Sequence, residues 1–256
     1  MRRAAALAAV AVLIGGCGDS GGSSSVPRGN PDARHGPAAV DDYAAVELLR
    51  ARLIASSDSY YSGGSADDAR IQLARARADY GALAPRVKAK DPVVDREVVA
   101  RFDTLARDIR RGTAPDHYRD LAGPLADQLM DGVSQALVAQ KARSDRGVQA
   151  EALRRVTSQM AATYDASAGT ADTDTGRLAF EESWGLWRRA LALTALIKSD
   201  LGSQKNTVAG SLNGLRGSAF PEGPSIVDEP AAQKVDSAST KVVDALDKRF
   251  GFDAAA

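Results

Sequence analysis

The sequence predicts an all-α protein, and three observations support this fold class. Aromatic residues make up only 5% of the 256 residues, whereas Ala, Leu, Val, Arg and Asp are abundant, a composition with good helix propensity and poor β-propensity. Apolar residues recur at helical spacing in several segments, and similar features return about one hundred positions later. A chain of this length can bury a core without disulfides, as one large domain or two of about 100 residues.

The first 16 residues have the features of a bacterial signal peptide. Met1-Arg2-Arg3 is positively charged, and residues 4–14 are an unbroken apolar stretch, too short to span about 30 Å of hydrocarbon as a mature helix. The next residues, Ile14-Gly15-Gly16-Cys17, resemble the lipobox of bacterial lipoproteins. We therefore expect cleavage before Cys17, lipid attachment to its thiol, and location on the extracytoplasmic face of a cell membrane.

The alternative is an ordinary signal peptide followed by a chance cysteine. Cys17 is the only cysteine of the chain, and its position directly after the leader favours the lipoprotein interpretation. A single cysteine also excludes intramolecular disulfides and CxxC sites. Cleavage leaves 31 basic against 33 acidic side chains, with no clustered basic excess, so a nucleic-acid partner is not expected.

Residues 17–38 are expected to be the lipidated cysteine and a disordered tether. Gly, Ser and Pro dominate this segment, and it holds almost no large apolar side chains that could offset the entropy lost on ordering. His35 lies in this segment and is interpreted as incidental rather than as a ligand.

An internal repeat is indicated in the remaining chain. Corresponding residues are separated by 104 positions, a distance that increases to 106 toward the C-terminus. We favour duplication over coincidence, and so predict two tandem four-helix units, residues 39–145 and 146–256. The matched pairs are Leu49-Arg50 with Leu153-Arg154, Tyr60 with Tyr164, Tyr80 with Trp184, Gly112-Thr113 with Gly217-Ser218, and Pro124 with Pro230.

The first unit is expected to contain helices at about 42–57, 66–85, 92–111 and 124–142. Ser65 and Asp68 resemble a capping box, and Pro85 is expected to kink or stop the second helix. Asp91 is a good N-cap before Pro92 at the first position of the third helix. The expected buried faces are Ile71, Ala74, Ala78 and Leu83 for the second helix and Val94, Val98, Phe102, Leu105 and Ile109 for the third.

The second unit is expected to contain helices at about 149–165, 177–198, 204–215 and 230–249, with a surface loop over 217–230. The helix at 177–198 is apolar around most of its circumference, so it should lie centrally or face the other unit. A membrane span is the alternative, but charged residues interrupt the segment too closely. These residues are Glu181, Glu182, Arg188 and Arg189.

No common catalytic motif is present, and no enzyme activity is expected. The sequence lacks a nucleophile elbow, a glycine-rich phosphate loop, an HExxH motif and a calcium loop. The metal-ligand candidates are Glu181, Glu182 and His117. His117 follows Pro115 in what is more simply a turn that begins a helix, and only one of the adjacent glutamates can face a given pocket. Solvation, or pairing of a glutamate with Arg188 or Arg189, is the simpler interpretation.

The stretch from Leu48 to Gly112 is similar to the extracytoplasmic helical domain that precedes the membrane part of bacterial high-affinity iron permeases. The similarity is carried by Tyr60-Tyr61, Gly63-Gly64, Tyr80, Asp91-Pro92, Glu97, Phe102, Leu105, Ile109 and Gly112. The resemblance implies a helical domain that assists iron delivery to a multispanning permease carrying Arg-Glu-x-x-Glu motifs.

This chain departs from the family pattern. No transmembrane permease part is expected, and the nearest local match, Arg96-Glu97-Val98-Val99-Ala100, lacks the final Glu. Ala82 and Val99 stand where the resemblance implies acidic residues. Hard cations need several converging oxygen ligands, so the loss of carboxylates weakens direct metal binding.

Two functions are carried forward. The first is a membrane-anchored extracytoplasmic lipoprotein that acts as an interaction or scaffold module of the cell envelope, without a cofactor. The alternative is an accessory module of iron uptake, which binds iron or another metal cation or docks on a membrane permease.

Overall fold

The computed structural model describes residues 29–61, 65–168, 170, 173–220, 224 and 231–252. Within these ranges the chain is helical and has no strand, only an isolated bridge between Arg216 and Phe220, so the all-α prediction is confirmed. The signal peptide and Cys17 lie outside the described residues. The elements are α1 (Pro31–His35), α2 (Pro37–Tyr61), α3 (Ala66–Lys90), α4 (Pro92–Arg110), α5 (Pro115–Pro124), the π-helical turn η1 (Leu125–Leu129), α6 (Met130–Leu137), α7 (Gln140–Arg143), α8 (Arg146–Ser167), α9 (Asp174–Leu196), the 3₁₀ turn η2 (Gly202–Gln204), α10 (Lys205–Asn213) and α11 (Ala232–Phe250).

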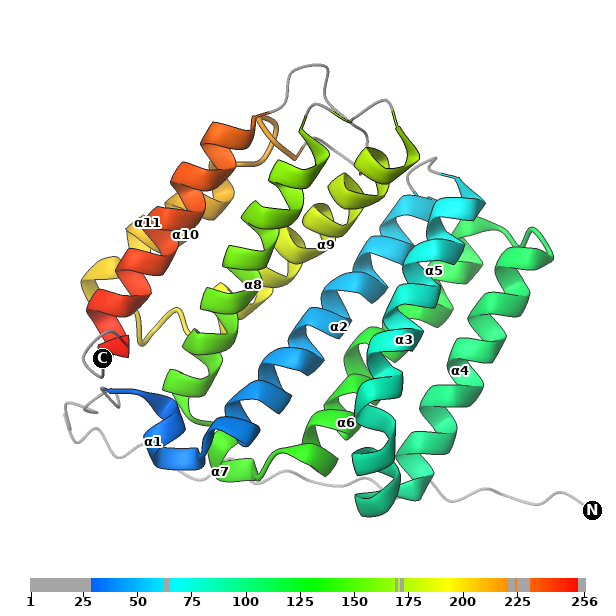
Figure 1. Ribbon diagram of the computed structural model, residues 1–256, viewed down its shortest axis with the longest axis horizontal. Helices are drawn as coiled ribbons and strands as arrows, with labels where there is room; N and C mark the ends of the chain where they lie inside the picture. Colours follow the sequence, from blue (N-terminus) through cyan, green and yellow to red (C-terminus); the bar gives the residue numbers. More distant parts are fainter. Residues whose placement is uncertain are drawn as a thin grey trace, which may run out of the picture.

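Helix α2 lies in the middle of the molecule (Figure 1). It packs against α8 and α9 on one side and against α3, α5 and α6 on the other. Most of its residues are buried, and they point in every direction around the helix axis rather than along one stripe. A helix that is buried all round belongs to the interior of a protein. The two sides of the molecule therefore share this helix.

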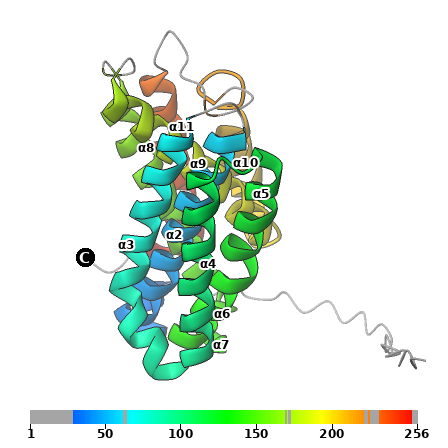
Figure 2. The ribbon, with the colours of Figure 1, turned by 90° about the vertical axis from the view of Figure 1, so that its right-hand side faces the viewer.

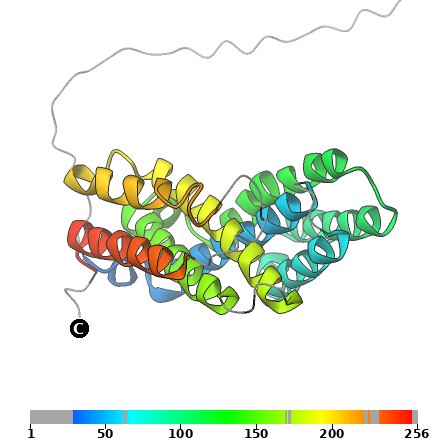
Figure 3. The same ribbon diagram turned by 90° about the horizontal axis from the view of Figure 1, so that it is seen from above.

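The apolar core forms two clusters that meet at α2. One cluster contains side chains of α3 to α6 with Val46, Leu49 and Leu53 of α2. The other contains side chains of α8 to α11 with Val40, Tyr43, Ala44 and Ala51 of α2. Figure 3 shows the corresponding helices on opposite sides of the molecule, with α10 and α11 at the end far from α4 and α5, and Figure 2 looks at the molecule from the side of α3 to α6.

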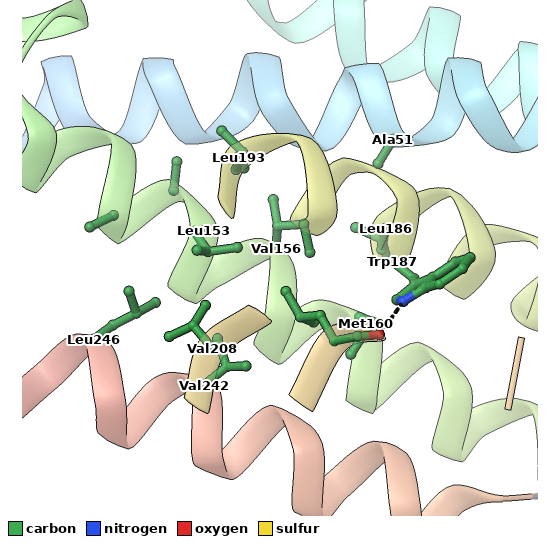
Figure 4. Close-up of a cluster of buried hydrophobic side chains, with 14 of the residues drawn as sticks. Ala51, Leu153, Val156, Met160, Leu186, Trp187, Leu193, Val208, Val242 and Leu246 are labelled. Carbon is green, nitrogen blue, oxygen red and sulfur yellow. Dashed lines mark hydrogen bonds between the residues drawn. The ribbon is translucent and has the colours of Figure 1, made fainter. Parts of the chain in front are cut away.

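The second cluster is filled mainly by aliphatic side chains and closed by aromatic rings. Leu153, Val156 and Met160 of α8 lie between α9 and α11 (Figure 4). The indole of Trp187 stacks on Phe220 with ring centroids 5.1 Å apart, and its Nε1 donates to the carbonyl of Leu212 at 2.9 Å. This hydrogen bond satisfies the polar atom of a buried tryptophan.

The predicted start signals of two helices are confirmed. The Ser65 side chain accepts a hydrogen bond from the Asp68 backbone N–H at 3.1 Å, and the Asp91 carboxylate accepts from the backbone N–H groups of Val93 and Val94. Four of the five side chains expected on the α4 core face are buried as predicted, and the fifth, Val94, is partly buried against the same core. The four buried side chains are Val98, Phe102, Leu105 and Ile109.

The expected buried face of α3 is wrong in part. Ala74 and Ala78 are exposed, and the helix is rotated so that larger side chains face the core. Alanine carries little information about orientation because it buries little area in either position. The α3 residues that fill the core are Leu73, Ala76, Tyr80, Leu83 and Val87.

Two prolines do not act as helix boundaries in the expected way. Helix α3 continues through Pro85 to Lys90. Because proline has no N–H, the carbonyl of Gly81 loses its helical donor, but Gly81 is exposed and water can bind this carbonyl. The fourth helix begins at Pro115 rather than near Pro124, and Pro124 stands at the junction between α5 and the π-helical turn η1. The turn predicted around Pro115 does begin the next helix.

The predicted tether is too long at its C-terminal end. Residues 31–35 form α1 and α2 starts at Pro37, both with proline in the first turn. The segment is attached through Asp145, which accepts hydrogen bonds from the side chains of Arg34 and His35 and also caps α8 through the backbone N–H of Gly147. These polar contacts order a segment that lacks apolar side chains, and they give His35 a structural role.

Helix α9 is central, as its apolar circumference predicted, and packs against both α8 and α2. In the described part of the chain, no helix combines the length and the hydropathy that crossing a membrane requires. The contact with α2 is close at Gly185, where an added methyl group would lie 2.2 Å from the carbonyl oxygen of Ala51 and 3.0 Å from Ala55 Cβ. A glycine is therefore required at this helix crossing.

We predict that Gly185→Ala lowers the free energy of unfolding by about 1–3 kcal/mol, because the two helices must separate to admit the methyl group. The matched control is Gly81→Ala in α3, where an added methyl group meets nothing within 4 Å. That change should raise stability by roughly 0.4–1 kcal/mol. Urea unfolding followed by far-ultraviolet circular dichroism measures both, and equal stability of the two variants would contradict the packing argument.

Candidate functional site

Charged residues are buried along α2 and bind partners on other helices. Asp42, Glu47 and Arg50 are each less than a tenth exposed. Burying a charge without a partner is strongly unfavourable, so each needs a counter-charge and hydrogen bonds. Arg86 of α3 provides them for Asp42, with Nη1 at 2.5 and 2.6 Å from the two carboxylate oxygens.

The most deeply buried of these groups is Glu47, which is 1% exposed. Its carboxylate accepts a short hydrogen bond from Nε of Arg189 on α9 and lies 3.5 Å from Nε of Arg50. Arg50 also donates to the backbone carbonyls of Ala126 and Asp127 at 2.8 and 3.1 Å, and it forms an ion pair with Asp131. One arginine therefore binds a glutamate of its own helix, the π-helical turn η1 and helix α6.

Glu182, one of the metal-ligand candidates, forms ion pairs with two arginines. Its carboxylate accepts from Arg52 of α2 at 3.0 Å and from Arg75 of α3 at 3.3 Å. Arg52 is bound to Asp79 as well, and burial raises the pKa of that carboxyl although Arg52 counteracts it. The expected pairing of Glu181 or Glu182 with Arg188 or Arg189 does not occur; Arg188 binds Asp58 and Arg189 binds Glu47 instead.

Glu181 is 1% exposed and has different neighbours from Glu182. Burial and, to a lesser extent, the negative charge of Asp68 raise the pKa of its carboxyl to about 7, although hydrogen bonding by Ser59 and Gln72 acts in the opposite direction. Its Oε2 atom has no hydrogen-bond partner in the described part of the chain. The adjacent glutamates thus face separate surroundings, and each is buried because α9 packs against α2 and α3 at this point.

The third candidate, His117, lies on the exposed surface in the first turn of α5. The following residue, Tyr118, is buried instead, and its hydroxyl is 2.8 Å from the hydroxyl of Ser56. No contact described for Glu181 or Glu182 involves His117. Among the described residues, no three His, Cys, Asp or Glu side chains form a group that could hold a metal ion.

Sequence reasoning missed the buried ion pairs that involve Asp68, Glu47 and Arg50. Arg177 Nε donates to Asp68 at 2.7 Å, although Asp68 had been assigned only a capping role. The available signal was a charged residue next to apolar ones inside a core helix, as in Val46-Glu47 and Leu49-Arg50. Such a pattern indicates buried charge but does not identify the partner.

No protein-family model matches this sequence, and comparisons with curated proteins and with solved structures give no significant match.

We predict that Glu181→Gln removes a pH-dependent loss of stability. The carboxyl ionises near 4.5 when unfolded but only near 7 when folded, so the native protein loses stability as the pH rises between these values. The free energy of unfolding of the variant minus that of the native chain should therefore be roughly 3 kcal/mol larger at pH 8 than at low pH.

Urea unfolding from pH 4.5 to pH 8 measures this effect, with Glu97→Gln on the exposed side of α4 as the matched control. A stability difference between the Glu181 variant and the native chain that stays constant over this range would show that the carboxyl does not titrate abnormally.

Proposed function

We propose that this protein is a lipid-anchored, extracytoplasmic helical module that acts by binding another component of the cell envelope rather than by catalysis. Cys17 would carry the lipid, and the segment before α1 would separate the helical body from the membrane. The lipobox-like sequence before Cys17 supports the proposed location. The pairing of the buried carboxylates with arginines supports the proposed role.

The observation that favours an interaction role is the pairing of buried carboxylates with arginines. Glu47, Asp68 and Glu182 each bind at least one guanidinium group of another helix. A carboxylate neutralised in this way serves helix packing and is less available to a metal ion or to a substrate. The same pairs give the body a fixed shape without disulfides, which suits a module that presents a surface.

We also propose that residues 39–145 and 146–256 are tandem four-helix units derived from one ancestor. Gly112 and Gly217, which are matched in the repeat, both have positive φ and both follow the third helix of their unit. Tyr60 and Tyr164 are likewise buried near the ends of α2 and α8. These equivalences support duplication; Pro230 lies outside the described residues.

Iron uptake is the alternative function, and its support is the resemblance of residues 48–112 to the helical domain of the iron permeases. The pairing of Glu182 with Arg52 and Arg75 argues for the interaction role instead, because a cation bound there would displace two guanidinium groups. Docking on a permease without direct metal binding remains part of this alternative.

We predict that Cys17→Ala moves the protein from the membrane fraction to the soluble extracytoplasmic fraction, because it removes the only thiol that can be acylated. Mass spectrometry of the native protein should find a diacylglyceryl group on Cys17 at the new N-terminus. An unmodified Cys17, or unchanged fractionation of the variant, would refute the anchor.

Photo-cross-linking in living cells tests the interaction role. Val93 and Val99 are exposed apolar residues of α4, and a photoreactive residue at either position should give a discrete cross-linked product if α4 faces a partner. A photoreactive residue at Asp120, an exposed charged position of α5, is the control. Tyr61 of α2 and Leu196 of α9 are the other large exposed apolar residues of the described chain, and absence of products at all four apolar positions would contradict the proposal.

Calorimetric titration of the Cys17→Ala chain with ferrous, ferric and cupric ions separates the two functions. The interaction role predicts no binding heat at micromolar concentrations and no rise in melting temperature, since any ligand of the native state must raise it. Binding that Glu182→Gln abolishes and Asp120→Asn preserves would favour the iron-uptake alternative instead.

A further inference from the structure

A polar pocket of about 430 Å³ lies between α2, the π-helical turn η1, α6, α7 and α9. It is separate from the surroundings of Glu181 and Glu182. The residues that fix its base are Glu47, Arg50 and Arg189, which are joined by the ion pairs described above. Glu47 is paired with both arginines, so the base is a preorganised network of ion pairs, in which Arg50 Nε has no hydrogen-bond partner in the described part of the chain.

Three further charged residues line this pocket. Asp131 is paired with Arg50, whereas Arg143 and Asp127 have no ion-pair partner among the described residues. Arg143 of α7 donates through Nε to the backbone carbonyl of Val138 at 3.0 Å, and no described carboxylate lies within 4.0 Å of its guanidinium group. The carboxylate of Asp127 on η1 is exposed and makes no described ion pair. The pocket therefore offers one unpaired positive charge and one unpaired negative charge.

An independent observation comes from Ser134 of α6. Its side chain lines the same pocket and is 4% exposed, and its Oγ has no hydrogen-bond partner in the described part of the chain. Buried hydroxyl groups normally have a partner, so an unpaired one beside a pocket indicates a group that a ligand can satisfy. The adjacent π-helical turn is also of a kind that is frequent at functional sites.

We propose that this pocket binds a small zwitterion of the class of amino acids and short peptides. The ligand's carboxylate pairs with Arg143, its ammonium group pairs with Asp127, and its polar backbone bonds to Ser134. Opposite charges at two separate points select a molecule that carries both, and a ligand with only one charge leaves the other protein charge unpaired. The binding activity is additional to the proposed interaction role and does not depend on it.

The test uses the full-length protein and a series of probes with increasing separation between the charged ends: alanine, dialanine and trialanine. Isothermal titration calorimetry and thermal unfolding at millimolar probe concentrations measure binding. We expect at least one member to bind and to raise the melting temperature. N-acetyl-dialanine and dialanine amide, which each lack one charge, should bind at least about tenfold more weakly than dialanine if dialanine is the preferred length.

Arg143→Gln and Asp127→Asn should each weaken binding of the preferred zwitterion at least about tenfold. The matched controls are Arg96→Gln and Asp120→Asn, which change exposed residues that do not line the pocket. Asp127→Asn should leave the affinity for the N-acetylated probe unchanged, because that probe has no ammonium group.

Two results would overturn the proposal. One is the absence of binding by every zwitterion to a native chain that unfolds cooperatively. The other is binding that Arg143→Gln and Asp127→Asn leave equal to that of their controls. The comparison of charged and blocked probes on the native chain needs no variant, so it remains decisive if Arg143→Gln perturbs the short helix α7.

Discussion

The structure depends on the burial of charged side chains along α2. Glu47 and Arg50 lie in the interior, where each ion would be strongly unfavourable alone, and both are held by groups from α9, η1 and α6. Removal of one partner from such a pair typically costs about 3–5 kcal/mol, since the remaining charge stays buried. The pairs therefore fix which helices can lie beside α2 more strictly than apolar contacts do, because apolar contacts tolerate sliding and rotation.

The central position of α2 joins the two apolar clusters into one body. Each cluster includes side chains of α2, so neither is completed by its own helices alone. Helix α9 strengthens this connection in two ways: it approaches the α2 backbone at Gly185, and it supplies Arg189 to Glu47 and Glu182 to Arg52. If the two halves arose by duplication, these contacts between them formed only afterwards, because a single unit has no partner half to contact.

Local features of the fold could be predicted from the sequence, and long-range ones could not. The caps at Ser65 and Asp91 and the core face of α4 depend on residues a few positions apart. The ion pairs of the candidate site join residues far apart, such as Arg189 with Glu47 across 142 positions and Arg52 with Glu182 across 130. A single sequence carries no signal for such a partner. The sequence likewise did not predict that residues 31–38 are ordered, because their structure depends on Asp145, which lies more than one hundred positions away.

The polar pocket follows from the same network. Arg50 donates hydrogen bonds to the backbone carbonyls of Ala126 and Asp127 in the π-helical turn while it remains paired with Glu47. The turn is thereby held against α2, and Asp127, which is exposed, is placed on the wall of the pocket. Arg50, which maintains the fold, thus also positions Asp127, whose charge is available to a ligand. Binding in the pocket and stability of the body should consequently be coupled through Arg50, since loss of this side chain would release the turn and leave Glu47 with Arg189 alone.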